Sequence, residues 1–368
     1  MHFPQGCSLS SLACFALSKQ QGSSLYGVTR SASQLSALPP ITEVSVETPA
    51  SKYDGLLDWL KSNGATVNND LCFRASSRGG GFGAFVNKDV AEGEILVSIP
   101  RNVCVTLDDV RNDNESGEIF EQLMREAGPG GNTIALAGII AKERLLIEAK
   151  GPEASRWGPY FETLPWARGI NNQEHMLFWT DEDIKTKLKG TMCYREVTAL
   201  RDEVELAIKV INTIIGKSVL ITRGELSDTK SGFSLPWEPK PEPLKRTVEG
   251  VPEAVRGAFV CLLTRAFQDG DEDADEEKLV PWLDMLQHSD EPNIKHIMRK
   301  DDKTVEVRAG KNIKAGDELF NQYRPEEEAT MPYHRFFTRY GFVPGISEDL
   351  VGLLDDKSSI FFAQTAEV

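Results

Sequence analysis

The chain has 368 residues, of which 40% are hydrophobic and 26% are charged, and its formal net charge is −15. This composition is that of a folded protein with a sizeable core, so wholesale disorder and fibrous classes are excluded. The acidic balance argues against nucleic acid or a membrane surface as a partner, and no apolar run is long enough to span a bilayer.

The first part of the chain has the composition of a targeting segment. Residues 1–42 contain neither Asp nor Glu and are rich in Ser. An acid-free, Ser-rich stretch before an acidic body is typical of an organelle transit peptide, and the scarcity of Arg favours a plastid. We therefore predict a leader over residues 1–50 and a chloroplast location, with a mitochondrion or the cytoplasm as alternatives. A plain disordered tail stays open as the other interpretation.

The body begins with one short helix followed by strand signals. Residues 54–63 predict a helix that Gly64 ends, and residues 71–100 predict strands and turns. The clearest strand covers residues 95–99 and stops at Pro100. This first block is therefore expected to be rich in β structure.

From residue 118 to about residue 267 the apolar spacing becomes helical. We predict helices over residues 134–149, 195–215 (ended by Gly216) and 252–267, with a Pro-rich loop at 225–250. The acidic run at 269–277 is expected to be a solvated loop and not a metal site. Short strands are then predicted at 279–286, 305–308 and 318–323, and a helix at about 326–340.

A helical block between two β-rich blocks indicates α+β architecture and not an alternating βαβ fold. The two β blocks also echo each other, because residues 88–96 and 311–319 share the pattern K-x-[VI]-x-x-G-[ED]-x-L. None of the six cysteines is in C-x-x-C spacing, which excludes a zinc ribbon and argues for reduced thiols.

Four short motifs carry the chemistry. They are residues 78–83 (RGGGFG), 286–293 (LQHSDEPN), 316–323 (GDELFNQY) and 340–342 (YGF). The glycines let a backbone approach a ligand closely, but no helix or Gly-Lys-Ser follows, so neither a dinucleotide fold nor a P-loop is indicated. No metal site is predicted, because the histidine has no further ligands at metal spacing.

In this order and spacing the four motifs resemble the SET-domain protein methyltransferases, from about residue 71 to residue 343. Residues 263–267 (LTRAF) and 280–285 (VPWLDM) are similar to the subclass of the Rubisco large-subunit methyltransferases. The resemblance implies a β-rich SET core, split and pseudoknotted, with a large helical insertion. Its predicted parts are the N-terminal half of the core at 51–112, the insertion at 113–255, the C-terminal half at 256–345 and a short tail at 346–368.

The resemblance also implies a cofactor, S-adenosylmethionine, and a reaction, methylation of a protein lysine. The catalytic residue would be Tyr323, which orients the amine and the methyl group. Arg265 would face the carboxylate of the cofactor, as a planar cation suits that anion. The cofactor-binding residues implied are Gly80, Gly81, Phe82, Arg265, Gln287, His288, Tyr340 and Phe342. The expected partner is a lysine-bearing segment of a non-histone protein, and the enzyme is expected to be a monomer.

The chain departs from the family in three places, of which one is the unusually acidic segment at 324–330 after Tyr323, either a recruiter of a basic substrate segment or a solvated helix start. Gln287 stands where the family has Asn, so its reach toward a ligand differs by one methylene. The subclass carries a helical substrate domain after the SET core, whereas about 25 residues follow Val343 here. Two alternatives therefore stay open: protein-histidine methylation, and a SET-like binding module without turnover.

Overall fold

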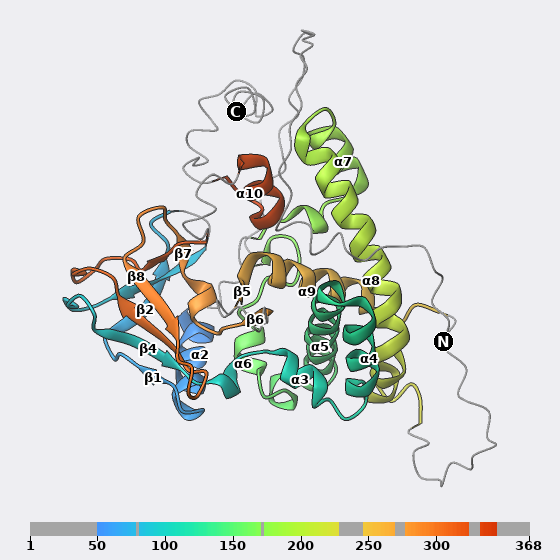
Figure 1. Ribbon diagram of the computed structural model, residues 1–368, viewed down its shortest axis with the longest axis horizontal. Helices are drawn as coiled ribbons and strands as arrows, with labels where there is room; N and C mark the ends of the chain where they lie inside the picture. The colour runs from blue at the N-terminus through green and yellow to red at the C-terminus, as the bar shows by residue number, and fades with distance from the viewer. Residues whose placement is uncertain are drawn as a thin grey trace.

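The computed structural model describes residues 50–78, 81–170, 173–227, 246–268, 277–323 and 332–343. Two lobes lie side by side, with the strands at the left of Figure 1 and the long helices at the right. The strand lobe mixes early strands, coloured blue to teal, with late strands, coloured orange. The predicted α+β class is therefore confirmed, and the strand lobe combines segments from before and after the helical block.

The main sheet joins four antiparallel strands in the order β1-β4-β9-β8. They are β1 (Thr66–Val67), β4 (Ile95–Ile99), β9 (Val305–Ala309) and β8 (Ile294–Met298). The β-branched residues of β4 and β9 suit a pleated, buried surface, and Pro100 ends β4 because it has no N–H for the ladder. The predicted strands at 95–99 and 305–308 are thus present and lie next to each other.

Three two-stranded pairs complete the β structure. β2 (Leu71–Ala75) and β3 (Phe82–Val86) are antiparallel, as are β5 (Ala266–Gln268) and β6 (Glu277–Leu279). β7 (Gln287–His288) and β10 (Phe320–Asn321) form a short parallel pair. This parallel pair places the second and third sequence motifs beside each other.

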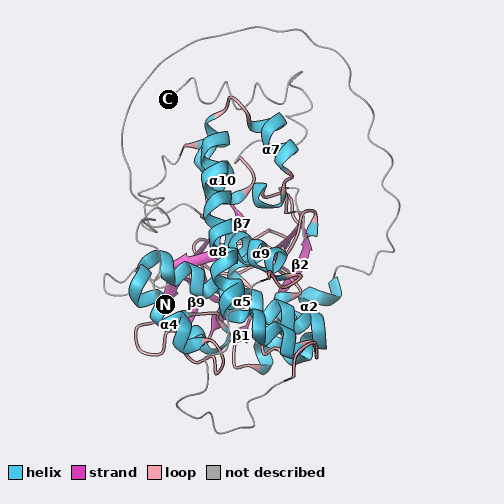
Figure 2. Ribbon diagram, turned by 90° about the vertical axis from the view of Figure 1, so that its right-hand side faces the viewer, coloured by secondary structure: helices cyan, strands magenta, loops and turns pink. Residues whose placement is uncertain are grey.

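The helices form the second lobe and also flank the first. α2 (Ala50–Ser62) packs against the strand lobe, and α5, α8 and α9 pack together, at the centre of Figure 2. The remaining bounds are α3 (Leu107–Arg111), α4 (Gly117–Ala127), α5 (Pro129–Lys150), α6 (Gly158–Phe161), α7 (Asp181–Leu188), α8 (Met192–Thr222), α9 (Val251–Arg265) and α10 (Tyr333–Tyr340). Short 3₁₀ turns lie at η1 (Arg101–Val103), η2 (Pro152–Ala154), η4 (Met176–Phe178) and η5 (Leu283–Met285). No helix in these ranges is both long and apolar enough to cross a bilayer.

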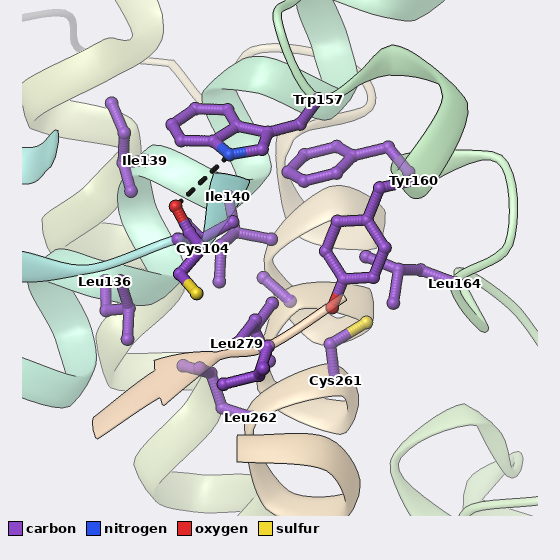
Figure 3. Close-up of a cluster of buried hydrophobic side chains, with 14 of the residues drawn as sticks. Cys104, Leu136, Ile139, Ile140, Trp157, Tyr160, Leu164, Cys261, Leu262 and Leu279 are labelled. Atoms are coloured by element: carbon purple, nitrogen blue, oxygen red, sulfur yellow. Dashed lines mark hydrogen bonds between the residues drawn. The ribbon is translucent and has the colours of Figure 1, made fainter. Parts of the chain in front are cut away.

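One hydrophobic cluster runs through both lobes. Figure 3 shows its centre, where Leu136, Ile139 and Ile140 of α5 face Cys261 and Leu262 of α9. The indole nitrogen of Trp157 donates to the carbonyl oxygen of Cys104 at 3.3 Å, which satisfies a polar group inside this cluster. The four described cysteines are free thiols.

Several element boundaries differ from the prediction. α8 continues through Gly216 to Thr222, because Val219 and Leu220 extend its buried face and offset the cost of a helical glycine. Phe267 lies in β5 and not in the preceding helix. The expected boundary of the insertion at residue 255 falls inside α9.

The predicted strand at 279–286 is wrong. β6 ends at Leu279, and the apolar residues that follow form the 3₁₀ turn η5, with Trp282 at a φ of 74°. An apolar run that is buried on every side shows no period, so its sequence cannot distinguish a strand from a buried turn. The third predicted strand is shorter than expected, since β10 covers only Phe320–Asn321. α10 begins after Pro332, and the acidic runs at 269–276 and 324–330 lie outside the described residues.

We expect Gly138→Ala and Gly55→Ala to differ in stability because only one of them meets a clash. A Cβ at Gly138 would lie 2.3 Å from the fully buried ring of Phe120, whereas nothing lies within 4 Å of a Cβ at Gly55. Both glycines are helical, so both variants gain up to about 1 kcal/mol of helix propensity. In urea unfolding, Gly138→Ala should be less stable than Gly55→Ala by about 1–3 kcal/mol. Equal stabilities would contradict the packing of α4 on α5.

Candidate functional site

One cavity of about 150 Å³ is lined by residues from both β segments and from the helical lobe. Its walls are Tyr53, Gly81, Phe82, Gln173, Glu174, Thr264, Arg265, Asp284, Met285, Gln287, Tyr323, Tyr340, Gly341 and Phe342. Most of the residues singled out in the sequence therefore meet at one place.

Seven of the nine predicted site residues line this cavity: Gly81, Phe82, Arg265, Gln287, Tyr323, Tyr340 and Phe342. Gly80 lies outside the described residues. His288 is buried behind Tyr323 and does not line the cavity; its Nδ1 accepts a hydrogen bond from the backbone nitrogen of Tyr323 at 3.2 Å. In this structure His288 therefore positions the backbone at Tyr323.

The buried carboxylate of Glu318 binds the residues that lead into the glycine turn. Glu318 accepts hydrogen bonds from Ser76 Oγ at 2.7 Å and from the backbone nitrogen of Ser77 at 2.8 Å. A Cβ at Gly83 would lie 1.9 Å from Glu318 Oε1, so only glycine leaves room for this carboxylate. Gly81 adopts a φ of 110°, a conformation that favours glycine. The glycines are thus needed for the turn itself as well as for access.

Gln287 connects the second motif to the same turn. Its side-chain Nε2 donates to the carbonyl oxygen of Phe82 at 3.0 Å. The extra methylene relative to Asn gives the amide the reach for this contact across the cavity wall. The departure from the family pattern at this position therefore has a structural role in the turn.

Arg265 belongs to a buried polar group under the cavity floor. Its Nη1 donates to the carbonyl oxygen of Asp284 at 2.9 Å and lies 3.7 Å from Asp284 Oδ2. The hydroxyl of Tyr160 donates to the same Oδ2 at 2.7 Å. Burial raises the pKa of the Asp284 carboxyl to about 6, although Arg265 and the Tyr160 hydrogen bond act in the opposite direction.

The uncommitted edge of Arg265 is its chemically useful part. Nη1 is held by Asp284, while Nε and Nη2 make no hydrogen bond to a described residue. A guanidinium edge with two parallel N–H groups matches a carboxylate in a bidentate pair. Because Arg265 lines the cavity, this edge can bind a carboxylate-bearing ligand there.

Tyr323 is fixed in a group of aromatic rings. Its hydroxyl donates to the carbonyl oxygen of Leu286 at 2.7 Å, and the hydroxyl of Tyr340 donates to the carbonyl oxygen of Tyr323 at 3.1 Å. The ring centroids of Tyr323 and Tyr340 are 5.2 Å apart, and Phe342 approaches both rings with 41% of its surface exposed. Burial raises the pKa of the Tyr323 phenol well above its usual value, so the phenol stays protonated at neutral pH.

Some lining residues were not predicted. Asp284 had a signal, since it is the one charged residue in the apolar run 279–286 and a buried charge needs a reason. Tyr53 had none, because an aromatic residue on a helix face is normally part of the core. It stacks on Phe73 and approaches Phe82, with ring centroids 4.9 and 5.0 Å apart, and so supports the turn from α2.

Comparison with known proteins agrees with this geometry. The SET-domain family model matches residues 81–324. The N-lysine methyltransferase setd6 of Xenopus laevis is 24% identical over 276 residues, covering 73% of this chain and 53% of that protein. The actin-histidine N-methyltransferase of Mus musculus is 24% identical over 326 residues, covering 86% of this chain and 47% of that protein. The chain thus spans about half the length of these curated relatives.

Solved structures show the same fold. The SET domain of LSMT bound to lysine and AdoHcy superposes with a TM-score of 0.57 at 16% identity, covering 80% of this chain and 58% of that one. Rubisco LSMT bound to AdoMet gives a TM-score of 0.57 at 16% identity, covering 80% and 57%. At 16% identity these superpositions show a shared fold alone.

We expect the buried Asp284 carboxyl to make stability depend on pH. Its folded-state pKa of about 6 lies above the usual 3.8, so its contribution to stability is complete below pH 3.8 and is lost as the pH rises through 6. Asp284→Asn has no such titration. Between about pH 4 and pH 7 the free energy of unfolding of the wild type should fall by about 3 kcal/mol relative to Asp284→Asn. Urea unfolding at several pH values measures this difference; a difference that stays constant with pH would contradict the burial.

Proposed function

The chain belongs to the SET-domain family, and we propose that it is an S-adenosylmethionine-dependent protein-lysine N-methyltransferase acting on a non-histone protein. The observation that carries this proposal is that the Arg265 guanidinium, the turn at Gly81–Phe82 and the ring of Tyr323 line one cavity. These groups come from chain segments far apart in the sequence, and a purely structural role gives no reason for them to meet.

The residues present fit the cofactor. When bound, S-adenosylmethionine supplies a methyl group on a positively charged sulfur atom. The Nε–Nη2 edge of Arg265 would hold its carboxylate, and the open backbone at Gly81 allows close approach. Phe342 offers a partly exposed aromatic face for the adenine ring.

Tyr323 acts by orientation in this proposal. Its phenol stays protonated at neutral pH, so it cannot serve as the base for the amine. The amine of a lysine has a usual pKa of about 10.4 and must arrive neutral. The aromatic rings of Tyr323, Tyr340 and Phe342 disfavour the charged form by excluding water, and the fixed phenol aligns the amine.

Two features support a basic protein segment as the substrate. The net charge of −15 attracts a lysine-rich partner, and the setd6 relative is a lysine methyltransferase. Histidine methylation is the second candidate, because the actin-histidine enzyme of Mus musculus aligns over 86% of this chain. An inactive module is disfavoured by the Gln287 contact, which keeps the turn in place in spite of the substitution. We further propose that the enzyme acts as a monomer.

We expect S-adenosylmethionine to stabilise the protein and Tyr323→Phe to separate binding from transfer. At a hundredfold excess over Kd the cofactor should add about 2.7 kcal/mol, measured as a thermal shift. Tyr323→Phe should keep this shift and lose about a hundredfold or more in methyl transfer from labelled cofactor, because the aligning hydroxyl is gone.

Mass spectrometry of the labelled acceptor distinguishes lysine from histidine. No shift at millimolar cofactor would overturn the enzyme proposal, and wild-type transfer by Tyr323→Phe would overturn only the role of Tyr323. Gly55→Ala serves as the control for folding, because Gly55 does not line the cavity and an added Cβ there has no atom within 4 Å.

We also propose that the enzyme works in the chloroplast. The acid-free, Ser-rich composition of residues 1–42 supports import, and the scarcity of Arg supports a plastid over a mitochondrion. Residues 1–50 fused to a fluorescent protein should carry it into chloroplasts of plant cells. Replacing several of the serines in this segment by glutamate should abolish import, and fluorescence in mitochondria or cytoplasm with the unchanged segment would contradict the proposal.

A further inference from the structure

The group of Tyr160, Asp284 and Arg265 links the helical lobe to the floor of the cavity. We propose that Tyr160 and Asp284 are positioning residues, which aim the free edge of Arg265 at the carboxylate of the cofactor. The inference rests on the proposed function and assigns to the helical insertion a direct part in cofactor affinity.

Tyr160 is rigidly held. It lies on α6, is fully buried, and its backbone carbonyl accepts a hydrogen bond from Thr163 Oγ at 2.6 Å. Figure 3 shows its ring directed toward Cys261 of α9, the helix that ends at Arg265. The phenol therefore has one orientation, and in it the hydroxyl donates to Asp284 Oδ2 at 2.7 Å.

The burial of the Asp284 carboxylate lowers the stability of the fold. Its side chain is fully buried, and its Oδ1 makes no hydrogen bond to a described residue. An apolar side chain of similar size would be cheaper for folding alone, because a buried charge loses its hydration. The position is therefore explained by what the carboxylate does for its neighbour, the guanidinium of Arg265.

Asp284 contacts Arg265 twice, through its backbone oxygen at 2.9 Å and its Oδ2 at 3.7 Å, and both contacts are to Nη1. Two contacts on one nitrogen fix the rotation of the guanidinium. Nε and Nη2 then stay available to a ligand in the cavity. Removing the Tyr160 hydroxyl frees the carboxylate to turn, and Arg265 then loses the alignment that a bidentate pair requires.

The experiment compares two ligands that differ at the amino-acid end. S-adenosylhomocysteine has the carboxylate, and 5′-methylthioadenosine lacks it. Calorimetric titration of the full chain should show that Tyr160→Phe weakens S-adenosylhomocysteine about tenfold, the effect of losing one hydrogen bond to a charged group. Binding of 5′-methylthioadenosine should be unchanged.

Ser116→Ala is the matched control. It removes a buried hydroxyl hydrogen bond, the one to Asp113 Oδ1 at 2.7 Å, at a residue of the helical insertion that does not line the cavity, so the two affinities should keep their ratio. Asp284→Asn should repeat the selective loss and also serves if Tyr160→Phe does not fold. Equal loss for both ligands, or tighter S-adenosylhomocysteine binding by Asp284→Asn, would overturn the inference while the proposed function stands. A wild type that binds neither ligand would overturn both.

Discussion

The side-chain amide of Asn293 forms hydrogen bonds with the backbone of residues 318–320, next to the short strand β10. Its Nδ2 donates to the carbonyl oxygen of Glu318 and its Oδ1 accepts from the backbone nitrogen of Phe320, both at 2.7 Å. Asn293 and Glu318 are buried and Phe320 is half-buried, so an unpaired group here would cost about 1–3 kcal/mol. This crossing of the two segments presents Glu318 to the glycine turn on one side and Tyr323 to the cavity on the other. The glycine turn and the placement of Tyr323 both depend on it.

The helical lobe supports the site from beneath, because its core is continuous with that of the strand lobe. α9 ends at Arg265 inside the cavity wall, and α6 supplies the tyrosine under Asp284. An insertion that packed separately could vary without effect on the chemistry. Here a change in the angle between α6 and α9 would move a charged group in the site, so packing and function are coupled through the core.

The sequence predicts well those parts of the fold that depend on local or repeated signals. The period of α8 and the β-branched residues of β4 and β9 are of this kind, and the four motifs place most of the cavity wall. The relation of Tyr160 to Asp284 could not be predicted, since it joins residues 124 positions apart and leaves no spacing to recognise. The buried run at 279–286 has no period that would indicate its structure. A glycine such as Gly216 ends a helix only where packing does not offset the conformational entropy that the glycine loses in the helix. Tertiary contacts decide these cases.

The central pairing of β4 with β9 also has a consequence during synthesis. β4 occupies residues 95–99 and its partner occupies residues 305–309, so one edge of the early strand has no neighbour until the residues between them have been synthesised. At about 5–20 residues per second this interval lasts tens of seconds. An open, apolar strand edge is a template for association with other chains. Translation speed across the helical insertion therefore sets how long this edge stays open to such association.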